Sequence, residues 1–303
     1  MPSRIRSLFL ALTVSLFIFA VSTTSAQTAP LKVVATFSIL GDITNNIGGD
    51  KIDLTVLVGP DADPHTFEPV PSDSATLNAT ALIFENGLGF EAWLDDLYAA
   101  SGSTATRVVV TQGIEPGQIA VGEETGETDP HAWQNVYYSI HMAEVVRDAL
   151  SQADPANAVA YQLNANHYVT QLLDLDTYIV EKVQTLPTEQ RKLVTDHDAF
   201  GYFAARYGFT VVGTALGSVS TEAADPSAAD IAQLVADIQA TGTKAIFAEN
   251  IENPQLMQQI ADQTGVKVGP PLYSDALGQP GTDGETYLKM MRYNVDAIVG
   301  ALS

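Results

Sequence analysis

The chain has 303 residues, a formal net charge of −22 and no cysteine, and nearly half of its residues are apolar. So large an acidic excess repels phosphate backbones and argues against nucleic-acid binding. Without cysteine there are no disulfides, no thiolate metal sites and no lipid-modified N-terminal cysteine. The apolar content suffices for a large core, and the length predicts about two domains.

The first 26 residues are typical of an export signal. Arg4 and Arg6 precede an uncharged apolar run over Leu8–Val21, and Thr24-Ser25-Ala26 offers small residues to a signal peptidase. The run is too short for a comfortable membrane span. We assign residues 1–26 to a cleaved signal peptide, whose removal takes the net charge from −22 to −24 because two arginines are lost. The mature protein is expected free in the periplasm and not lipid-anchored, although a secreted Gram-positive protein fits the same signal.

Strands and helices alternate through residues 27–153, which we assign to a first lobe. This alternation is typical of a parallel α/β sheet covered on both faces by helices. Ligands of such sheets bind in loops beyond the carboxyl ends of the strands. The predicted strands are Leu31–Ser38, Ile52–Val58, Thr80–Phe84 and Arg107–Val110, and the predicted helices are Ile39–Ile47, Ser72–Leu77, Phe90–Ala99 and Val136–Leu150.

Residues 154–187 predict one long helix. Asp154 is a good N-cap, Pro155 suits the first helical position, and Pro187 marks the far boundary. The helix is long for a globular domain, and strand-rich sequence lies on both sides of it. We therefore expect a rigid helix that joins two lobes. Its apolar face recurs at steps of three and four residues and comprises Tyr161, Ala165, Tyr168, Leu172, Leu175, Ile179 and Val183.

Residues 188–303 repeat the architecture of the first lobe without repeating its sequence. The predicted fold class is therefore α/β, with two lobes, each a mostly parallel sheet flanked by helices, joined by one long rigid helix. The second lobe's predicted strands are Lys192–Thr195, Thr210–Val212, Lys244–Ala248 and a short one near Val266–Tyr273. Its predicted helices are one opened by Asp198, then Asp225–Ala240, Pro254–Thr264 and Asp283–Leu302.

Two of the five histidines each end a copy of the same tripeptide, Asp-Pro-His. Asp63-Pro64-His65 occupies the loop after the second strand, and Asp129-Pro130-His131 lies in a later loop of the first lobe. A proline directly before each histidine constrains the backbone that carries the imidazole. A repeated tripeptide makes these two histidines better candidates for a site than a lone loop histidine would be.

The second lobe offers His197, at the end of a predicted strand, and Asp275, after the last one. Neutral imidazole and carboxylate are standard ligands of a borderline divalent cation. The candidate residues of the two lobes are widely separated along the chain, so they do not form a compact zinc-binding motif. His141 and His167 lie inside predicted helices with no second ligand three or four residues away, so we interpret both as structural.

The chain resembles the zinc- and manganese-binding solute-binding proteins of bacterial ABC importers, the cluster A-I or TroA-like family. The resemblance implies two α/β lobes joined by one long helix, with one metal ion held between them by His65, His131, His197 and Asp275. The matching stretches, in the family's order, are Ala35–Leu40, Asp63–His65, Asn86–Trp93, Asp129–Trp133, His197–Phe203 and Leu272–Asp275.

Two departures from the family pattern bear on the metal. Many zinc importers carry a histidine-rich loop before the second ligand, whereas here Gly117–Asp129 is acidic and is interpreted as a solvated loop. Manganese-specific members usually have a glutamate where this chain has His197. Three imidazoles and one carboxylate suit Zn²⁺, which is commonly four-coordinate, although Asp275 could bind through both oxygens and Mn²⁺ is possible.

The predicted function is a periplasmic high-affinity zinc-binding protein that delivers its ion to an ABC transporter permease in the inner membrane. A periplasmic metallochaperone is a further candidate partner, and we expect a monomer that is not an enzyme. The alternatives are a manganese-specific member of the same family, a surface adhesin, and a zinc-dependent hydrolase using Asp275 as general base. Around the site, Glu249 is a candidate to orient a ligand imidazole, and Trp133 and Phe200 are expected to pack and exclude water.

Overall fold

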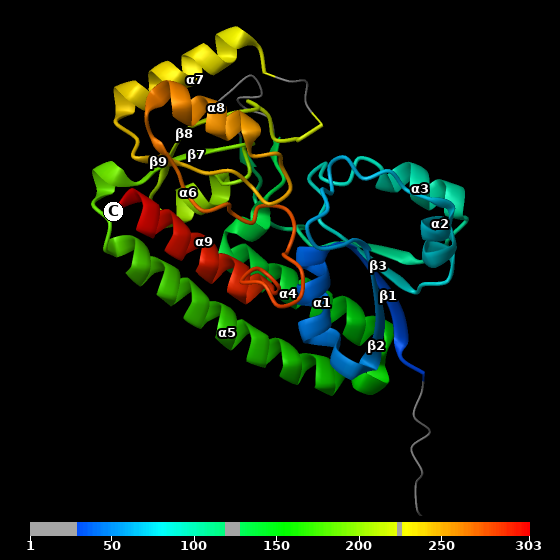
Figure 1. Cartoon of the computed structure of the whole chain (residues 1–303). Helices are drawn as coiled ribbons and strands as arrows, with labels where there is room; N and C mark the ends of the chain where they lie inside the picture. The colour runs from blue at the N-terminus through cyan, green and yellow to red at the C-terminus, as the bar shows by residue number, and fades with distance from the viewer. Residues whose placement is uncertain (1–28, 119–127, 223–225) are drawn as a thin grey trace, which may run out of the picture.

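The computed structural model describes residues 29–118, 128–222 and 226–303, and it has two lobes lying along one long helix (Figure 1). The predicted signal peptide, most of the acidic stretch at 117–129 and Asp225 lie outside the described residues. Within the described ranges, no helix is both long and apolar enough to span a bilayer. The lobe boundaries at 27–153, 154–187 and 188–303 stay a prediction.

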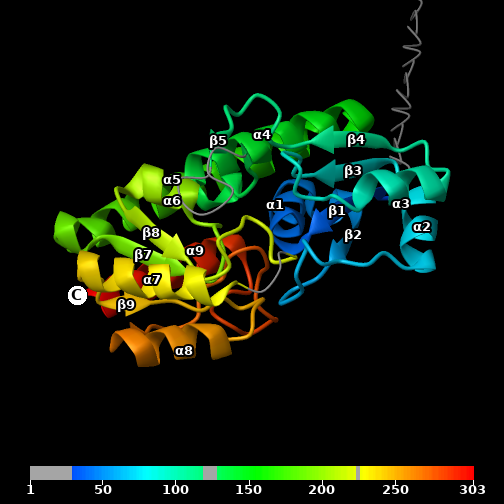
Figure 2. The same cartoon turned by 90° about the horizontal axis from the view of Figure 1, so that it is seen from above.

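The first lobe contains a four-stranded parallel sheet in the order β2-β1-β3-β4. Its strands are β1 (Leu31–Phe37), β2 (Ile52–Val58), β3 (Leu82–Glu85) and β4 (Thr106–Val109). The central position of β1 explains why its last five residues, Val33–Phe37, are all buried, because both faces of a strand in this position are covered. Helices on the two faces are α1 (Ser38–Gly48, continued by the 3₁₀ turn Gly49–Lys51) and the pair α2 (Pro71–Asn78) and α3 (Leu94–Ser101), as Figure 2 shows.

The predicted helix over Phe90–Ala99 begins late, at Leu94. The preceding turn contains Leu88 and Gly89 at φ 57° and 83°, left-handed conformations that cannot start a helix. The carboxylate of Glu91 points inward, where it accepts hydrogen bonds from the Thr36 hydroxyl (2.7 Å) and from the backbone N–H of residue 86 (2.7 Å). These contacts hold residues 86–93 as a turn instead of a helix.

The second lobe has the parallel pairs β7 (Lys192–Thr195) with β8 (Thr210–Thr214) and β9 (Ala245–Ile246) with β10 (Lys267–Val268). The backbone N–H of Phe247 donates to the carbonyl of Val194 at 2.9 Å and so joins the two pairs. The predicted strands at 244–248 and 266–273 are longer than the observed ones, because the chain leaves the sheet early to form loops. The helices of this lobe are α6 (Gly201–Tyr207), α7 (Ala228–Thr241), α8 (Gln255–Thr264) and α9 (Tyr287–Leu302).

Between the sheets, the short antiparallel pair β5 (Gly117–Gln118) and β6 (Thr128–Asp129) leads into a 3₁₀ turn at Ala132–Gln134 and helix α4 (Val136–Ala153). The long helix α5 (Ala158–Gln184, 27 residues) lies against α4 and α9 along the base of both lobes (Figures 1 and 2). All seven residues of its predicted apolar face are buried, so the prediction of a long linking helix is confirmed.

The start of α5 differs from the prediction. Residues 155–157 form a 3₁₀ turn, and the α-helix begins only at Ala158. The Asp154 carboxylate accepts from the Asn157 side-chain amide (2.6 Å) and the Tyr161 hydroxyl (2.9 Å) instead of capping the first backbone amides. The periodicity also gave no sign of Asp176, which is buried on α5 and pairs through both carboxylate oxygens with Arg206 of α6.

Candidate metal centre

Four side chains converge between the lobes: His65, His131, His197 and Asp275. One potential ligand atom from each lies within 4.8 Å of those of the other three, the arrangement needed around a single ion. Asp275 Oδ2 is 3.1 Å from His65 Nε2 and 3.0 Å from His197 Nε2, and its Oδ1 is 3.6 Å from His131 Nε2. The structure therefore brings together all four residues that the sequence analysis named.

Each lobe supplies two of the four side chains. His65 lies in the loop after β2, and His131 lies between β6 and the 3₁₀ turn that precedes α4. His197 follows β7, and Asp275 follows Leu272, which makes a parallel bridge with Glu249. The loops of His65 and His197 are at the carboxyl ends of parallel strands, where ligands of such sheets bind, and that of Asp275 follows a parallel bridge. The β6 loop is the exception, because β6 is antiparallel to β5.

His131 is held by the aspartate two residues before it. Asp129 Oδ1 accepts from the backbone N–H of His131 and lies 2.9 Å from its Nδ1. Both side chains are buried. The contact at Nδ1 leaves Nε2 as the ring nitrogen that faces the other three side chains, since a partner at one nitrogen fixes the orientation of the ring.

His197 is held in the same way by Glu249, the residue that the sequence analysis named as a candidate to orient an imidazole. Glu249 Oε2 lies 2.7 Å from His197 Nδ1. The other oxygen, Oε1, accepts from the backbone N–H groups of Asp196 (2.9 Å) and His197 (3.0 Å). The backbone N–H of Glu249 in turn donates to Asp196 Oδ2 at 2.7 Å. Glu249 thus fixes both the ring and the backbone of His197.

The loop of Asp275 is fixed by side chains from the opposite lobe. The indole N–H of Trp133 and the amide of Gln134 both donate to the carbonyl of Ser274, at 2.9 Å and 3.1 Å. All of these groups are buried. The hydrogen bonds tie the segment that follows His131 to the residue before Asp275, so the positions of two candidate ligands from different lobes are coupled.

Aromatic rings form the wall of the site on the first lobe. The ring of Phe90 lies 4.8 Å from His65 and 4.9 Å from Trp133, and Trp133 lies 5.3 Å from His131. Trp133 therefore occupies the water-excluding position expected of it. Phe200 is also buried, and its ring contact is with Phe203 in the core rather than with a histidine of the cluster.

His65 is the most accessible member of the cluster, with 6% of its side chain exposed. It lies in the wall of a cavity of about 560 Å³ that is also lined by Phe90, Thr128, Ser220 and Glu222. The other three members are fully buried. Of the four residues, His65 is therefore the one in contact with this cavity.

The unpaired atoms of the cluster fit a cation. His65 Nε2, His131 Nε2 and Asp275 Oδ1 are buried, and none has a hydrogen-bond partner among the described residues. Buried polar atoms without partners are costly, so a site that leaves several of them facing one point is suited to a ligand. Imidazole nitrogens and a carboxylate are a donor set for Zn²⁺ and related divalent ions.

The charges within the cluster are strongly coupled. Burial alone would lower the pKa of His131, but the negative charges of Asp275 and Asp129 outweigh burial and raise this pKa to about 9. Burial would raise the pKa of Asp275, yet the imidazoles of His197 and His131 hold it well below its usual range. Asp275 is thus an anion, and a proton on His131 competes with a metal ion for the same Nε2 atom.

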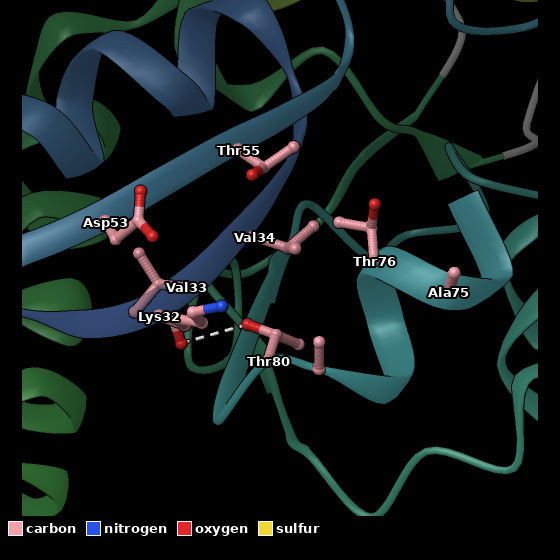
Figure 3. A pocket seen from close by; sticks show the side chains of 9 residues that line it. Lys32, Val33, Val34, Asp53, Thr55, Ala75, Thr76 and Thr80 are labelled. Carbon is pink, nitrogen blue, oxygen red and sulfur yellow. Dashed lines mark hydrogen bonds between the residues drawn. The ribbon is translucent and has the colours of Figure 1, made fainter. Parts of the chain in front are cut away.

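The remaining histidines lie apart from the cluster. His141 Nε2 lies 2.8 Å from the carbonyl of Gln112, and His167 is exposed on α5. A separate cavity of about 290 Å³ lies between α2 and the sheet, toward the amino ends of the strands, and is lined by Lys32, Asp53 and Thr80 among others (Figure 3). It is at the opposite end of the sheet from the loop of His65 and contains no histidine.

Comparisons with known proteins identify the family to which the chain belongs. The family described as "Zinc-uptake complex component A periplasmic" matches residues 33–301. The manganese-binding lipoprotein MntA of Halalkalibacterium halodurans is 36% identical over 280 residues, covering 92% of this chain and 91% of that protein. The manganese ABC transporter substrate-binding lipoprotein PsaA of Streptococcus mitis is 33% identical over 285 residues, covering 92% and 91%. The solved structure of the periplasmic zinc-binding protein TroA from Treponema pallidum is 34% identical, with a TM-score of 0.84 over 90% of this chain and 99% of that one.

One prediction is corrected by these comparisons. The sequence analysis placed the protein free in the periplasm without a lipid anchor. Its relatives are named as lipoproteins, which contradicts that location. The inference rested on the missing N-terminal cysteine alone, and one absent residue type was too narrow a basis for it.

The family assignment rests on the length of the match and on the level of identity. The match spans almost the whole of the chain beyond the predicted signal peptide. The relatives exceed 30% identity over more than nine-tenths of this chain. The chain belongs to the family of metal-binding, substrate-binding components of ABC transporters, as the resemblance in the sequence indicated.

Proposed function

We propose that this member of the family captures Zn²⁺ between its two lobes and delivers it to the permease of an ABC importer. The observation that carries the proposal is the convergence of three imidazoles and one carboxylate, two from each lobe, within 4.8 Å. His65, His131, His197 and Asp275 are the proposed ligands. An ion that bridges the lobes stabilises the closed arrangement, which the permease can recognise as the loaded form.

The donor set favours zinc. Zn²⁺ is commonly bound by four nitrogen, sulfur or oxygen ligands in a tetrahedron, which matches the number of groups present. Mn²⁺ is harder, prefers oxygen ligands and binds a given nitrogen-rich site more weakly. His197 is fully buried in the cluster and supplies a third nitrogen, at a position where a carboxylate would suit manganese better. Its presence therefore favours zinc.

Manganese is the second candidate, and two observations support it. Relatives of this chain are named as manganese-binding proteins. Both oxygens of Asp275 face the imidazoles, Oδ2 toward His65 and His197 and Oδ1 toward His131. Bidentate binding through Asp275 would raise the coordination number to five, closer to what Mn²⁺ prefers.

A hydrolase using Asp275 as general base fits less well. A general base works best with a pKa near the operating pH, and the pKa of Asp275 lies far below that range. The carboxylate is also fully buried among the imidazoles, where it can act as a ligand. Asp275→Asn separates the two functions: loss of metal affinity supports a ligand, whereas retained affinity with loss of a hydrolytic activity supports the enzyme.

The movement that accompanies ion release should be small. The unbroken helix α5 lies along both lobes, and hydrogen bonds such as Trp133 to Ser274 cross between them. We expect loops to become ordered on binding and the lobes to shift slightly, so the scattering radius should change little when zinc is added.

Metal analysis of the purified protein, followed by competitive titration with Zn²⁺ and Mn²⁺, tests the proposed function. We expect one equivalent of metal per chain and tighter binding of zinc. Tighter binding of manganese would mean that the protein captures Mn²⁺ rather than Zn²⁺. The absence of metal binding would overturn both the zinc and the manganese proposal. Pull-down of the permease by the metal-loaded chain tests delivery, and the same experiment would detect a metallochaperone.

A further inference from the structure

The loop that carries His65 is attached to the opposite lobe by hydrogen bonds that do not involve the proposed ligands. The backbone N–H of Asp61 donates to the carbonyl of Leu277 at 2.8 Å, and the amide of Asn250 donates to Asp61 Oδ1 at 3.0 Å. The side-chain amide of Gln279 donates to the carbonyl of Pro60 at 3.1 Å. These contacts secure the base of the loop, several residues before His65.

Asp63 makes the contact closest to His65. Its Oδ1 accepts from the backbone N–H of His65 at 2.8 Å, which forms the turn that presents the imidazole. Its Oδ2 accepts from the Thr66 hydroxyl at 2.8 Å and from the Thr221 hydroxyl at 2.5 Å. Thr66 belongs to the same loop, whereas Thr221 belongs to the other lobe. One carboxylate therefore joins the turn of His65 to the second lobe.

Thr221 is itself positioned by the strand end that carries His197. After β8, the backbone N–H of Leu216 donates to the carbonyl of Asp196 at 2.8 Å. The backbone N–H of Asp198 donates to the carbonyl of Ser218, also at 2.8 Å, and the Ser218 hydroxyl accepts from the N–H of Ser220. Helix α6, which the sequence analysis expected to be opened by Asp198, begins only at Gly201.

These hydrogen bonds and the backbone of residues 216–221 together connect the neighbours of His197 through Asp63 to His65. A ligand imidazole in one lobe is linked to one in the other without passing through the ion. His65 is the only one of the four proposed ligands that is not fully buried, and it borders the cavity that Ser220 and Glu222, next to Thr221, also line. Opening of the His65 loop requires the bond between Thr221 and Asp63 to break.

We propose that Thr221 is a positioning residue that holds the His65 loop closed through Asp63 and so slows release of the bound ion. The inference rests on the proposed function, because it concerns how long an ion stays in that site. A hydroxyl-to-carboxylate hydrogen bond is stronger than a neutral one, and its loss should speed opening of the loop. The hydrogen bond from Thr221 to Asp63, called the tether below, forms only when the loop is closed. The rate of ion capture should therefore change little.

Thr221→Val removes the hydroxyl at nearly constant volume and tests the proposal. Zinc-loaded protein is mixed with excess chelator, and the release rate is followed by stopped flow. We expect release about tenfold faster than in the wild type, from the loss of one charge-assisted hydrogen bond, with an unchanged association rate. Thr221→Ser, which keeps the hydroxyl, should restore a rate close to that of the wild type.

Thr66→Val is the matched control, because it removes a hydroxyl from the same Asp63 oxygen without breaking a contact between lobes. We expect less than a twofold change in its release rate. Equal acceleration by Thr66→Val and Thr221→Val would overturn the proposal, as would failure of Thr221→Ser to restore the rate. Thermal unfolding without zinc should agree between Thr221→Val and wild type, which separates a tether from a general loss of folding.

The outcomes also distinguish the tether from the proposed function. If the wild-type chain binds no zinc, the proposed function fails and the tether fails with it. If the wild type binds zinc and Thr221→Val releases it at the wild-type rate, only the tether fails.

Discussion

The two Asp-Pro-His loops share a sequence and a turn, but their surroundings differ. In both, the aspartate Oδ1 accepts from the backbone N–H of the histidine, at 2.8 Å in the first loop and 2.9 Å in the second. In the second, the same oxygen also lies 2.9 Å from the Nδ1 atom of His131. In the first, the carboxylate instead bonds hydroxyls, one of them across the lobes.

Burial separates the loops further. His131 is fully buried, and the carbonyl of Asp129 accepts from the Tyr202 hydroxyl at 3.0 Å inside the protein. His65 borders a cavity, and Asp63 is only partly buried. The contacts therefore favour a rigid position for His131 and a more movable one for His65, the two proposed ligands that the tripeptides carry. The difference comes from residues that lie far away in the sequence.

Removing the imidazoles should produce the largest effect. His131→Ala and His65→Ala should each weaken zinc binding by more than about 100-fold, since even the partners of metal ligands are worth 10- to 100-fold. We expect the greater loss for His131→Ala, because the rigid, buried ligand cannot be replaced by water as easily. Chelator competition measures both. His141→Ala, on the surface of α4, is the control, and an equal loss there would remove the ligand assignment.

Replacing the two aspartates compares the loops directly. Asp129→Asn removes the charge beside the Nδ1 atom of His131 and should weaken zinc binding roughly 10- to 100-fold. Asp63→Asn keeps an oxygen that can accept from the backbone of His65 but loses the acceptor of the Thr221 hydroxyl, so the loss should be about tenfold, as for Thr221→Val. Titration with zinc gives both values. If Asp63→Asn were the more damaging, the distinction between a rigid and a movable loop would be wrong.

The pH dependence of zinc affinity tests whether His131, in the second loop, has the raised pKa described above. Because the pKa of His131 is raised to about 9, its Nε2 atom binds a proton below that pH, and zinc must displace the proton. Apparent affinity should therefore fall as the pH decreases from 9 to 7, by about tenfold per unit for each proton displaced. This range is higher than the one near 6.5 expected from an unperturbed imidazole. Equal affinity at pH 7 and pH 9 would contradict the coupling of His131 to Asp275.

Two glycine substitutions should give the smallest effects. A Cβ atom at Gly201 would lie 2.5 Å from Asp129 Oδ2, whereas one at Gly59, which opens the first loop, would meet nothing within 4 Å. Gly201→Ala should lower the free energy of unfolding by about 1–3 kcal/mol, the usual cost of overpacking. Gly59→Ala should be close to neutral. Denaturant unfolding measures both, and similar values for the two variants would show that the Asp129 carboxylate has room to move.

The sequence predicted those parts of the molecule that depend on local patterns. The spacing of apolar residues located β2 with its observed bounds and all seven buried residues on the stripe of α5. The repeated tripeptide and the strand ends offered the four residues as candidates, and the resemblance to the family singled them out as one set. Hydrophobic periodicity and the carboxyl ends of parallel strands are properties of short segments, so they could be predicted locally.

Contacts between distant residues could not be predicted in this way. Asp176 on α5 pairs with Arg206, Thr221 with Asp63, and nothing in the flanking sequence indicates either pair. The start of α5 was misplaced because Asp154 bonds side chains instead of backbone amides. Such choices depend on which partner the fold brings near, so they become visible only in three dimensions.

A crystal structure of the zinc-loaded protein with anomalous scattering at the zinc edge tests the central claim most directly. The account predicts one anomalous peak between the lobes, about 2.0–2.2 Å from the Nε2 atoms of His65, His131 and His197 and from at least one oxygen of Asp275. A peak elsewhere, or an ion held by the histidines alone while Asp275 binds only a water molecule, would contradict it.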